Sequence, residues 1–173
     1  MESCSPLICN PPSGASSTAP SVGLCPACGL RAKRVKRLTM EHLLVPGAIP
    51  QIGNTQYYFC ETPKCPMAYF PYDAHAAVFP KANLRVRIGI KEAEDPVPFC
   101  YCFGITRKDV CDEIEQTGKS TVVNRVKAEV KAGNCACEVK NPSGKCCLGS
   151  VTRAVQEGLK TIRSFAMADR THG

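Results

Sequence analysis

The sequence predicts an α+β fold, in which a small β-rich half is followed by a mainly α-helical half. Three observations support this prediction. The chain has thirteen cysteines but no Trp and only 6% aromatic residues. Apolar residues alternate with period two before residue 91, and they recur at helical spacing after residue 105. The two periodicities divide the chain into two halves of different secondary structure.

The composition indicates small hydrophobic cores that need covalent or metal crosslinks to be stable. Disulfides are typical of oxidising compartments, but the first 20 residues contain neither a basic segment nor a long apolar stretch. No apolar run of about 18 residues occurs, so we expect no membrane insertion. The sequence therefore favours a cytoplasmic protein whose cysteine pairs bind metals.

We expect three segments along the chain. Residues 1–22 are rich in Ser, Pro and Gly, which predicts a flexible tail, and its Cys4 and Cys9 are read as free thiols rather than as a third metal site. Residues 23–95 are expected to form a β-rich, zinc-ribbon-like domain. Residues 96–173 are expected to form a helical domain.

Three short strands are expected in the first half, at Gln56–Cys60, Met67–Phe70 and Leu84–Ile90. The third shows the clearest alternation, because apolar residues at every second position are separated by arginines and a glycine. Prolines and glycines between these segments supply the turns.

Three helices are expected in the second half. Thr106 and Asp109 have the spacing of a capping box, and Gly118 is a C-terminal stop for the same helix. Ser120 can cap a second helix, and residues 148–167 form a third with apolar positions near helical spacing. The apolar stripes of the second and third helices are Val122, Val123, Val126, Val130, Val151, Val155, Leu159, Ile162 and Phe165.

Two cysteine pairs in the first half have the spacing of a zinc site. Cys25 and Cys28 are separated by two residues and followed by a glycine, and Cys60 and Cys65 form a wider pair between the expected strands. His75 is a rival ligand, but four cysteines already complete a tetrahedron, so we expect this histidine to be exposed or bonded elsewhere. A closed site of this kind cannot activate water, which argues against hydrolysis.

The second half contains another set of cysteines. Cys100 and Cys102 are separated by a single tyrosine, a spacing tighter than is usual for zinc. Four more follow the first two expected helices: Cys135, Cys137, Cys146 and Cys147. Spacing alone leaves zinc and an iron–sulfur cluster comparable.

The chain resembles the N-terminal module of CopZ-type copper chaperones, which are themselves similar to bacterioferritin-associated ferredoxins. The resemblance rests on Cys100-Tyr-Cys102 and on the segment 137–147, which ends Asn-Pro-Ser-Gly-Lys-Cys-Cys. It extends over about residues 24–150, including the four zinc-type cysteines. It implies Zn²⁺ at those four, and a [2Fe–2S] cluster at Cys100, Cys102, Cys137 and Cys147.

This assignment leaves three cysteines of the second half spare. Cys111 lies near the apolar face of the first expected helix and is expected to be a small buried residue. Cys135 and Cys146 are expected to be thiols near the cluster, and either could replace an assigned ligand. The family also has a heavy-metal-associated domain with a Met-x-Cys-x-x-Cys loop, which has no match in these residues. Copper delivery is therefore not simply inherited.

The leading functional hypothesis is a metal-trafficking accessory that handles copper, with one-electron reduction of Cu(II) to Cu(I). Copper would be bound transiently, and the partner would be a copper pump, a separate copper carrier or another redox protein. One alternative is a ferredoxin-like protein that transfers electrons to a redox or metal-storage protein. A zinc-ribbon nucleic-acid binder is the other alternative.

The net charge of +7 gives only limited support to nucleic-acid binding. Four thiolates on Zn²⁺ carry a net charge of about −2, which offsets part of the basic excess. The basic stretch 31–37 also lacks interleaved aromatic residues for base stacking. An enzyme is not expected, because no Gly-rich phosphate loop or nucleophile motif occurs and the three histidines, His42, His75 and His172, are widely spread.

Overall fold

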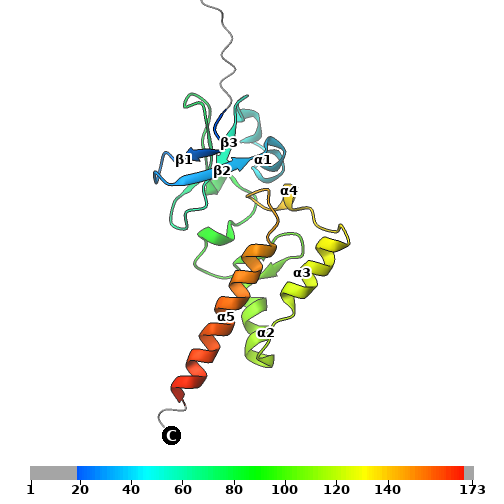
Figure 1. Cartoon of the computed structure of the whole chain (residues 1–173). Coiled ribbons are helices and arrows are strands. Elements are labelled where there is room, and N and C mark those ends of the chain that lie inside the picture. The colour runs from blue at the N-terminus through cyan, green and yellow to red at the C-terminus, as the bar shows by residue number, and fades with distance from the viewer. Residues whose placement is uncertain (1–18, 170–173) are drawn as a thin grey trace, which may run out of the picture.

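The computed structural model describes residues 19–169, with side chains as far as Lys160. Cys4, Cys9 and His172 lie outside the described residues. The predicted fold class is confirmed, because an antiparallel sheet occupies the first half and helices occupy the second (Figure 1). Among the described residues, no helix combines the length and hydrophobicity needed to cross a membrane.

The first half is built on a five-stranded antiparallel sheet in which each strand pairs with the next along the chain. Helix α1 and three short 3₁₀ helices connect the strands or follow them. The strands are β1 (Val22–Leu24), β2 (Arg31–Val35), β3 (Tyr57–Phe59), β4 (Met67–Pro71) and β5 (Phe79–Pro80). The helices are α1 (Arg37–Leu43), η1 (Ile49–Gln51), η2 (Lys81–Asn83) and η3 (Gly89–Lys91).

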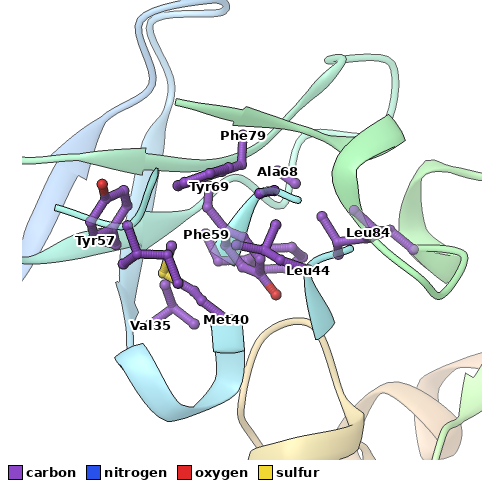
Figure 2. Packing of buried hydrophobic residues seen from close by; sticks show 12 residues of the cluster. Val35, Met40, Leu44, Tyr57, Phe59, Ala68, Tyr69, Phe79 and Leu84 are labelled. Carbon is purple, nitrogen blue, oxygen red and sulfur yellow. The ribbon is translucent and has the colours of Figure 1, made fainter. Parts of the chain in front are cut away.

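Strand β3 is buried on both faces, and its successive side chains pack alternately into two different hydrophobic clusters. Tyr57 and Phe59 enter the main core (Figure 2), whereas Tyr58 lies in a second cluster with the zinc-type cysteines and stacks on Phe70 with ring centroids 5.5 Å apart. The main core also contains Met40, Leu44, Tyr69, Phe79 and Leu84. The central strand therefore couples the metal site to the hydrophobic core.

The expected strand Leu84–Ile90 is wrong. Leu84 makes only an isolated bridge to Leu44, and the Arg85 N–H donates to the Leu43 carbonyl oxygen at 2.8 Å, so these groups bond to the end of α1 and not to the sheet. The chain then turns into η3 at Gly89, where an added Cβ would lie 2.0 Å from the Pro98 carbonyl oxygen. Leu84 and Ile88 are buried but Ile90 is 52% exposed, so the alternation predicted neither a strand nor the full set of buried residues.

The second half consists of a small hairpin and four helices. They are β6 (Pro98–Cys100), β7 (Ile105–Thr106), α2 (Arg107–Thr117), α3 (Val122–Lys131), α4 (Cys137–Lys140) and α5 (Leu148–Asp169). The expected capping box of Thr106 and Asp109 is present, and Gly118 ends α2 with φ 68°. Thr121 is the N-cap of α3, and the hydroxyl of Ser120 accepts a hydrogen bond from Val122 N–H at 3.3 Å.

Cysteines are part of the hydrophobic core of the helical half. Apolar faces of α2, α3 and α5 meet along the bundle, and the core closes over three buried cysteines at one end. The buried members are Cys100, Val110, Ile114, Val122, Val126, Cys137, Cys147, Val151 and Val155. This packing positions the second cysteine set.

The two halves pack against each other through α1 and α4, which are adjacent in Figure 1. The buried hydroxyl of Tyr69 donates to the Pro142 carbonyl oxygen at 2.8 Å, and Lys36 pairs with Glu138. Pro20, which precedes β1, also contacts the sheet half, because its carbonyl oxygen accepts hydrogen bonds from Arg34 and Tyr58.

Candidate metal centres

Four cysteine sulfurs of the first half converge on one point. Cys25 and Cys28 come from the turn after β1, and Cys60 and Cys65 come from the connection between β3 and β4. All four Sγ atoms lie within 4.8 Å of one another. Two of the separations are 3.9 Å, for Cys25 and Cys65, and 3.8 Å, for Cys28 and Cys60. A zinc tetrahedron with Zn–S bonds of about 2.3 Å has edges of about 3.8 Å, so this donor set fits Zn²⁺.

The first pair is held in a tight backbone turn. The Gly29 N–H donates to the Cys25 carbonyl oxygen at 2.8 Å, and Cys25 N–H donates to the Leu30 carbonyl oxygen at 2.9 Å. Gly29 has φ 71°, a left-handed conformation that favours glycine. The Cys-Pro-Ala-Cys-Gly sequence thus closes the turn that aims both thiols at the site.

The thiols of this site differ in acidity. Burial raises the pKa of Cys25 to about 12 and also raises the pKa of Cys65. The hydroxyl of Thr62, 3.4 Å from the Cys28 sulfur, contributes most to lowering the pKa of Cys28 to about 6. A metal must therefore displace protons from the buried thiols on binding. His75 is exposed, as expected, and is not among the grouped ligand atoms.

Sequence reasoning missed a buried lysine beside this site. Lys91 lies at the end of η3 and is 8% exposed. Its Nζ lies 2.7 Å from the Thr62 carbonyl oxygen, 3.0 Å from that of Cys65 and 3.7 Å from the Cys60 sulfur. The sequence signal was a single lysine after a glycine and an isoleucine, which alone does not indicate burial or a partner.

The second cysteine set forms two close pairs. Cys102 and Cys137 have sulfurs 3.4 Å apart, and Cys100 and Cys147 have sulfurs 3.0 Å apart. The first member of each pair comes from the β6–β7 hairpin, and the others come from α4 and from the residue before α5. Within residues 19–160, these sulfurs do not form a further group of three or more within 4.8 Å of one another. The arrangement is two dithiol pairs and not one tetrahedron.

Burial controls the acidity of the thiols in the second cysteine set. It raises the pKa of Cys137 to about 11 and also raises the pKa of Cys147, so both thiols are protonated at neutral pH without a metal. The Ala136 N–H donates to the Cys102 sulfur at 3.3 Å. Of the spare thiols, Cys146 is exposed and Cys135 is half-buried. Cys111 is also half-buried, so the expectation that it would be buried is wrong, because it lies at the edge of the apolar face of α2.

Comparison with known proteins identifies the family. Residues 22–85 match the family model described as the CopZ-type zinc-binding domain. The fold matches the crystal structure of the CopZ N-terminal domain of Archaeoglobus fulgidus with a TM-score of 0.62 and 35% sequence identity, covering 75% of this chain and 95% of that structure. The chain belongs to the family of CopZ N-terminal domains. The matched zinc-binding domain contains the four-cysteine cluster of the sheet half, whose geometry fits Zn²⁺.

The complete relative is longer than this chain. The curated copper chaperone CopZ of A. fulgidus is 36% identical over 123 residues, which are 71% of this chain and 57% of that protein. The chain thus spans a little over half the length of the CopZ protein that it matches. The activity of the whole CopZ protein therefore bears on this chain only as a proposal.

Proposed function

We propose that this chain is a metal-trafficking module that handles copper, with zinc as a structural ion and a [2Fe–2S] cluster at the second cysteine set. The observation that carries the proposal is the two close cysteine pairs of the second half, in a chain whose fold matches a domain of a copper chaperone. The boundary near residue 95 between a zinc-binding and a cluster-binding domain is part of the proposal.

The second set fits a two-iron cluster, because each iron takes two protein thiolates. Cys102 and Cys137 would hold one iron, and Cys100 and Cys147 the other. The cluster, when bound, supplies one electron at a time. The Ala136 N–H would stabilise negative charge on the Cys102 sulfur, and the surrounding valines would exclude water from the buried side of the site.

Copper would be received at the exposed side of this site. Cys146 is exposed beside the ligand Cys147, and Cys135 is half-buried close to Cys137. Thiolates are soft ligands that favour Cu(I) over Cu(II). One electron converts Cu(II) to Cu(I), and these two thiols would hold the product until a separate carrier or a copper pump takes it.

The test begins with metal content. Protein purified without oxygen should contain about one zinc, two irons and two sulfides per chain. The protein is then reduced with dithionite, freed of excess reductant and mixed with one equivalent of Cu(II) beside a Cu(I)-specific chelator. We expect the visible spectrum to return to that of the oxidised protein as the Cu(I) complex appears. Absence of sulfide would refute the cluster, and a spectrum that stays reduced without Cu(I) would refute copper reduction.

Ferredoxin-like electron transfer is the second candidate. It is favoured by two exposed basic residues on β2, Arg31 and Lys33, which could dock an acidic partner. A protein that contains the cluster but does not reduce copper would support this function. The same stretch gives less support to nucleic-acid binding, because Arg34, Lys36 and Arg37 all bond within the chain.

A further inference from the structure

The buried ammonium of Lys91 has an acceptor for each of its three hydrogens. A lysine ammonium has three N–H donors and no acceptor. Two donors meet the carbonyl oxygens of Thr62 and Cys65, and the third faces the Cys60 sulfur at 3.7 Å. All three acceptors belong to the connection that presents the second pair of zinc ligands.

A buried charge is costly unless an opposite charge compensates for it. Zinc with four thiolates carries a net charge of about −2, so the ammonium and the loaded site compensate each other. The position of Lys91 is also fixed independently of the metal. Ile88 is buried in the main core, and Gly89 N–H donates to the Tyr101 hydroxyl at 2.9 Å.

We propose that Lys91 protects the zinc site from thiol-seeking metals and electrophiles, and in particular from exchange with Cu(I). The zinc-bound thiolates are the nucleophiles in such reactions, and withdrawing negative charge from them slows attack. In exchange, Zn–S bonds break as Cu–S bonds form, Zn²⁺ leaves, and no oxidation state changes. The copper part of this inference depends on the proposed function, because a copper-handling protein must keep its structural zinc in the presence of Cu(I).

The chain offers a matched control. Lys64 lies between Cys60 and Cys65 but is exposed, so Lys64→Met removes the same charge near the same site without removing a buried donor. Lys91→Met keeps the length of the side chain and removes its charge, Lys91→Gln keeps a neutral donor, and Lys91→Arg keeps the charge.

The experiment uses the whole 173-residue chain, loaded with zinc, under anaerobic conditions. One arm measures zinc released to a chromophoric chelator after Cu(I) is added, and the other measures thiol alkylation by iodoacetamide with mass spectrometry. We expect both rates to rise about tenfold in Lys91→Met and in Lys91→Gln, the lower end of the range for the loss of a partner of a metal ligand. Both rates in Lys91→Arg should stay closer to those of the wild-type protein. Both rates in Lys64→Met should equal those of the wild-type protein.

Rates in Lys91→Met and Lys91→Gln equal to that of Lys64→Met would overturn the proposal. Zinc release from Lys91→Arg as fast as from Lys91→Met would also overturn it, since Lys91→Arg retains the charge. Wild-type protein gives a result that needs no variant. Cys25 and Cys60 are both 1% exposed, so burial does not distinguish them, and Cys60 should be alkylated after Cys25. The reverse order would contradict a protective role for Lys91.

Comparison with the Cu(II)-reduction assay described above separates this inference from the proposed function. Faster alkylation of Lys91→Met, together with failure of wild-type protein to reduce Cu(II), would retain the role of Lys91 and refute copper handling. Normal Cu(II) reduction by the wild-type protein, together with unchanged zinc release from Lys91→Met, would retain copper handling and refute the role of Lys91.

Discussion

Tyr69→Phe removes one oxygen atom from the contact between the sheet half and the loop that carries part of the second cysteine set. The Tyr69 hydroxyl is fully buried and donates to the carbonyl oxygen of Pro142 at 2.8 Å. Pro142 lies between Cys137 and Cys147, in the loop that joins two of the proposed cluster ligands. Phenylalanine would fill almost the same space but leave a buried carbonyl oxygen without this donor.

The expected cost follows from that lost bond. Leaving a buried acceptor unsatisfied costs about 1–3 kcal/mol. At about 2 kcal/mol, the melting temperature of a chain of this length falls by about 4–8 °C. If loop opening limits metal loss from the second site, the same free energy corresponds to about a 30-fold faster loss. Thermal unfolding by circular dichroism and bleaching of the visible spectrum in excess chelator measure the two effects.

Tyr57→Phe is the matched control. Tyr57 is 2% exposed, and its hydroxyl accepts a hydrogen bond from Gly53 N–H at 3.0 Å, entirely within the sheet half. This variant should lose stability without faster bleaching. Equal bleaching rates in the two variants would refute the idea that Tyr69 supports the ligand loop.

Three further predictions concern single residues. Gly144→Ala should lower the free energy of unfolding, measured in urea, by about 1 kcal/mol or more beyond the effect of Gly118→Ala. Both glycines have positive φ, but only at Gly144 would the new Cβ collide, 2.7 Å from the Thr39 hydroxyl. Equal losses in the two variants would argue against tight packing at Gly144. Cys147→Ser should alter the visible spectrum more than Cys146→Ser, because Cys147 is buried against Cys100 and Cys146 is exposed, and the reverse would reassign the ligand. Cys25→Ser should unfold the sheet half, because metal binding there contributes folding free energy; full zinc content with unchanged thermal stability would contradict this.

Sequence signals predicted the secondary structure correctly where the residues that determine an element lie within that element or next to it. The capping box at Thr106 and the stop at Gly118 were confirmed because both act through nearby backbone groups. Strands β3 and β4 were confirmed within one residue at each end. The expected strand 84–90 was wrong because the segment begins with a backbone bond to the end of α1, and alternation of apolar residues carries no information about hydrogen-bond partners.

The two cysteine sets differed in how much of their arrangement could be predicted from the sequence. Spacing of two cysteine pairs was enough to predict which four sulfurs lie together in the first half, because these cysteines come from two compact turns. Spacing could not choose the metal of the second set, and the ligand residues there remain a prediction that rests on the family resemblance. Helix α1 was missed because it is short and begins inside the basic stretch, at Arg37. Lys91 was missed because its partners lie 26 to 31 positions away.

The two-sided burial of β3 limits how this family can change in length. Tyr57 and Phe59 serve the main core, while Tyr58 and the adjoining Cys60 serve the zinc site. A one-residue insertion within the strand would exchange its two faces, placing core aromatics at the metal and withdrawing the ligand. Insertions and deletions among relatives should therefore avoid β3 and collect in the exposed turn at residues 72–75.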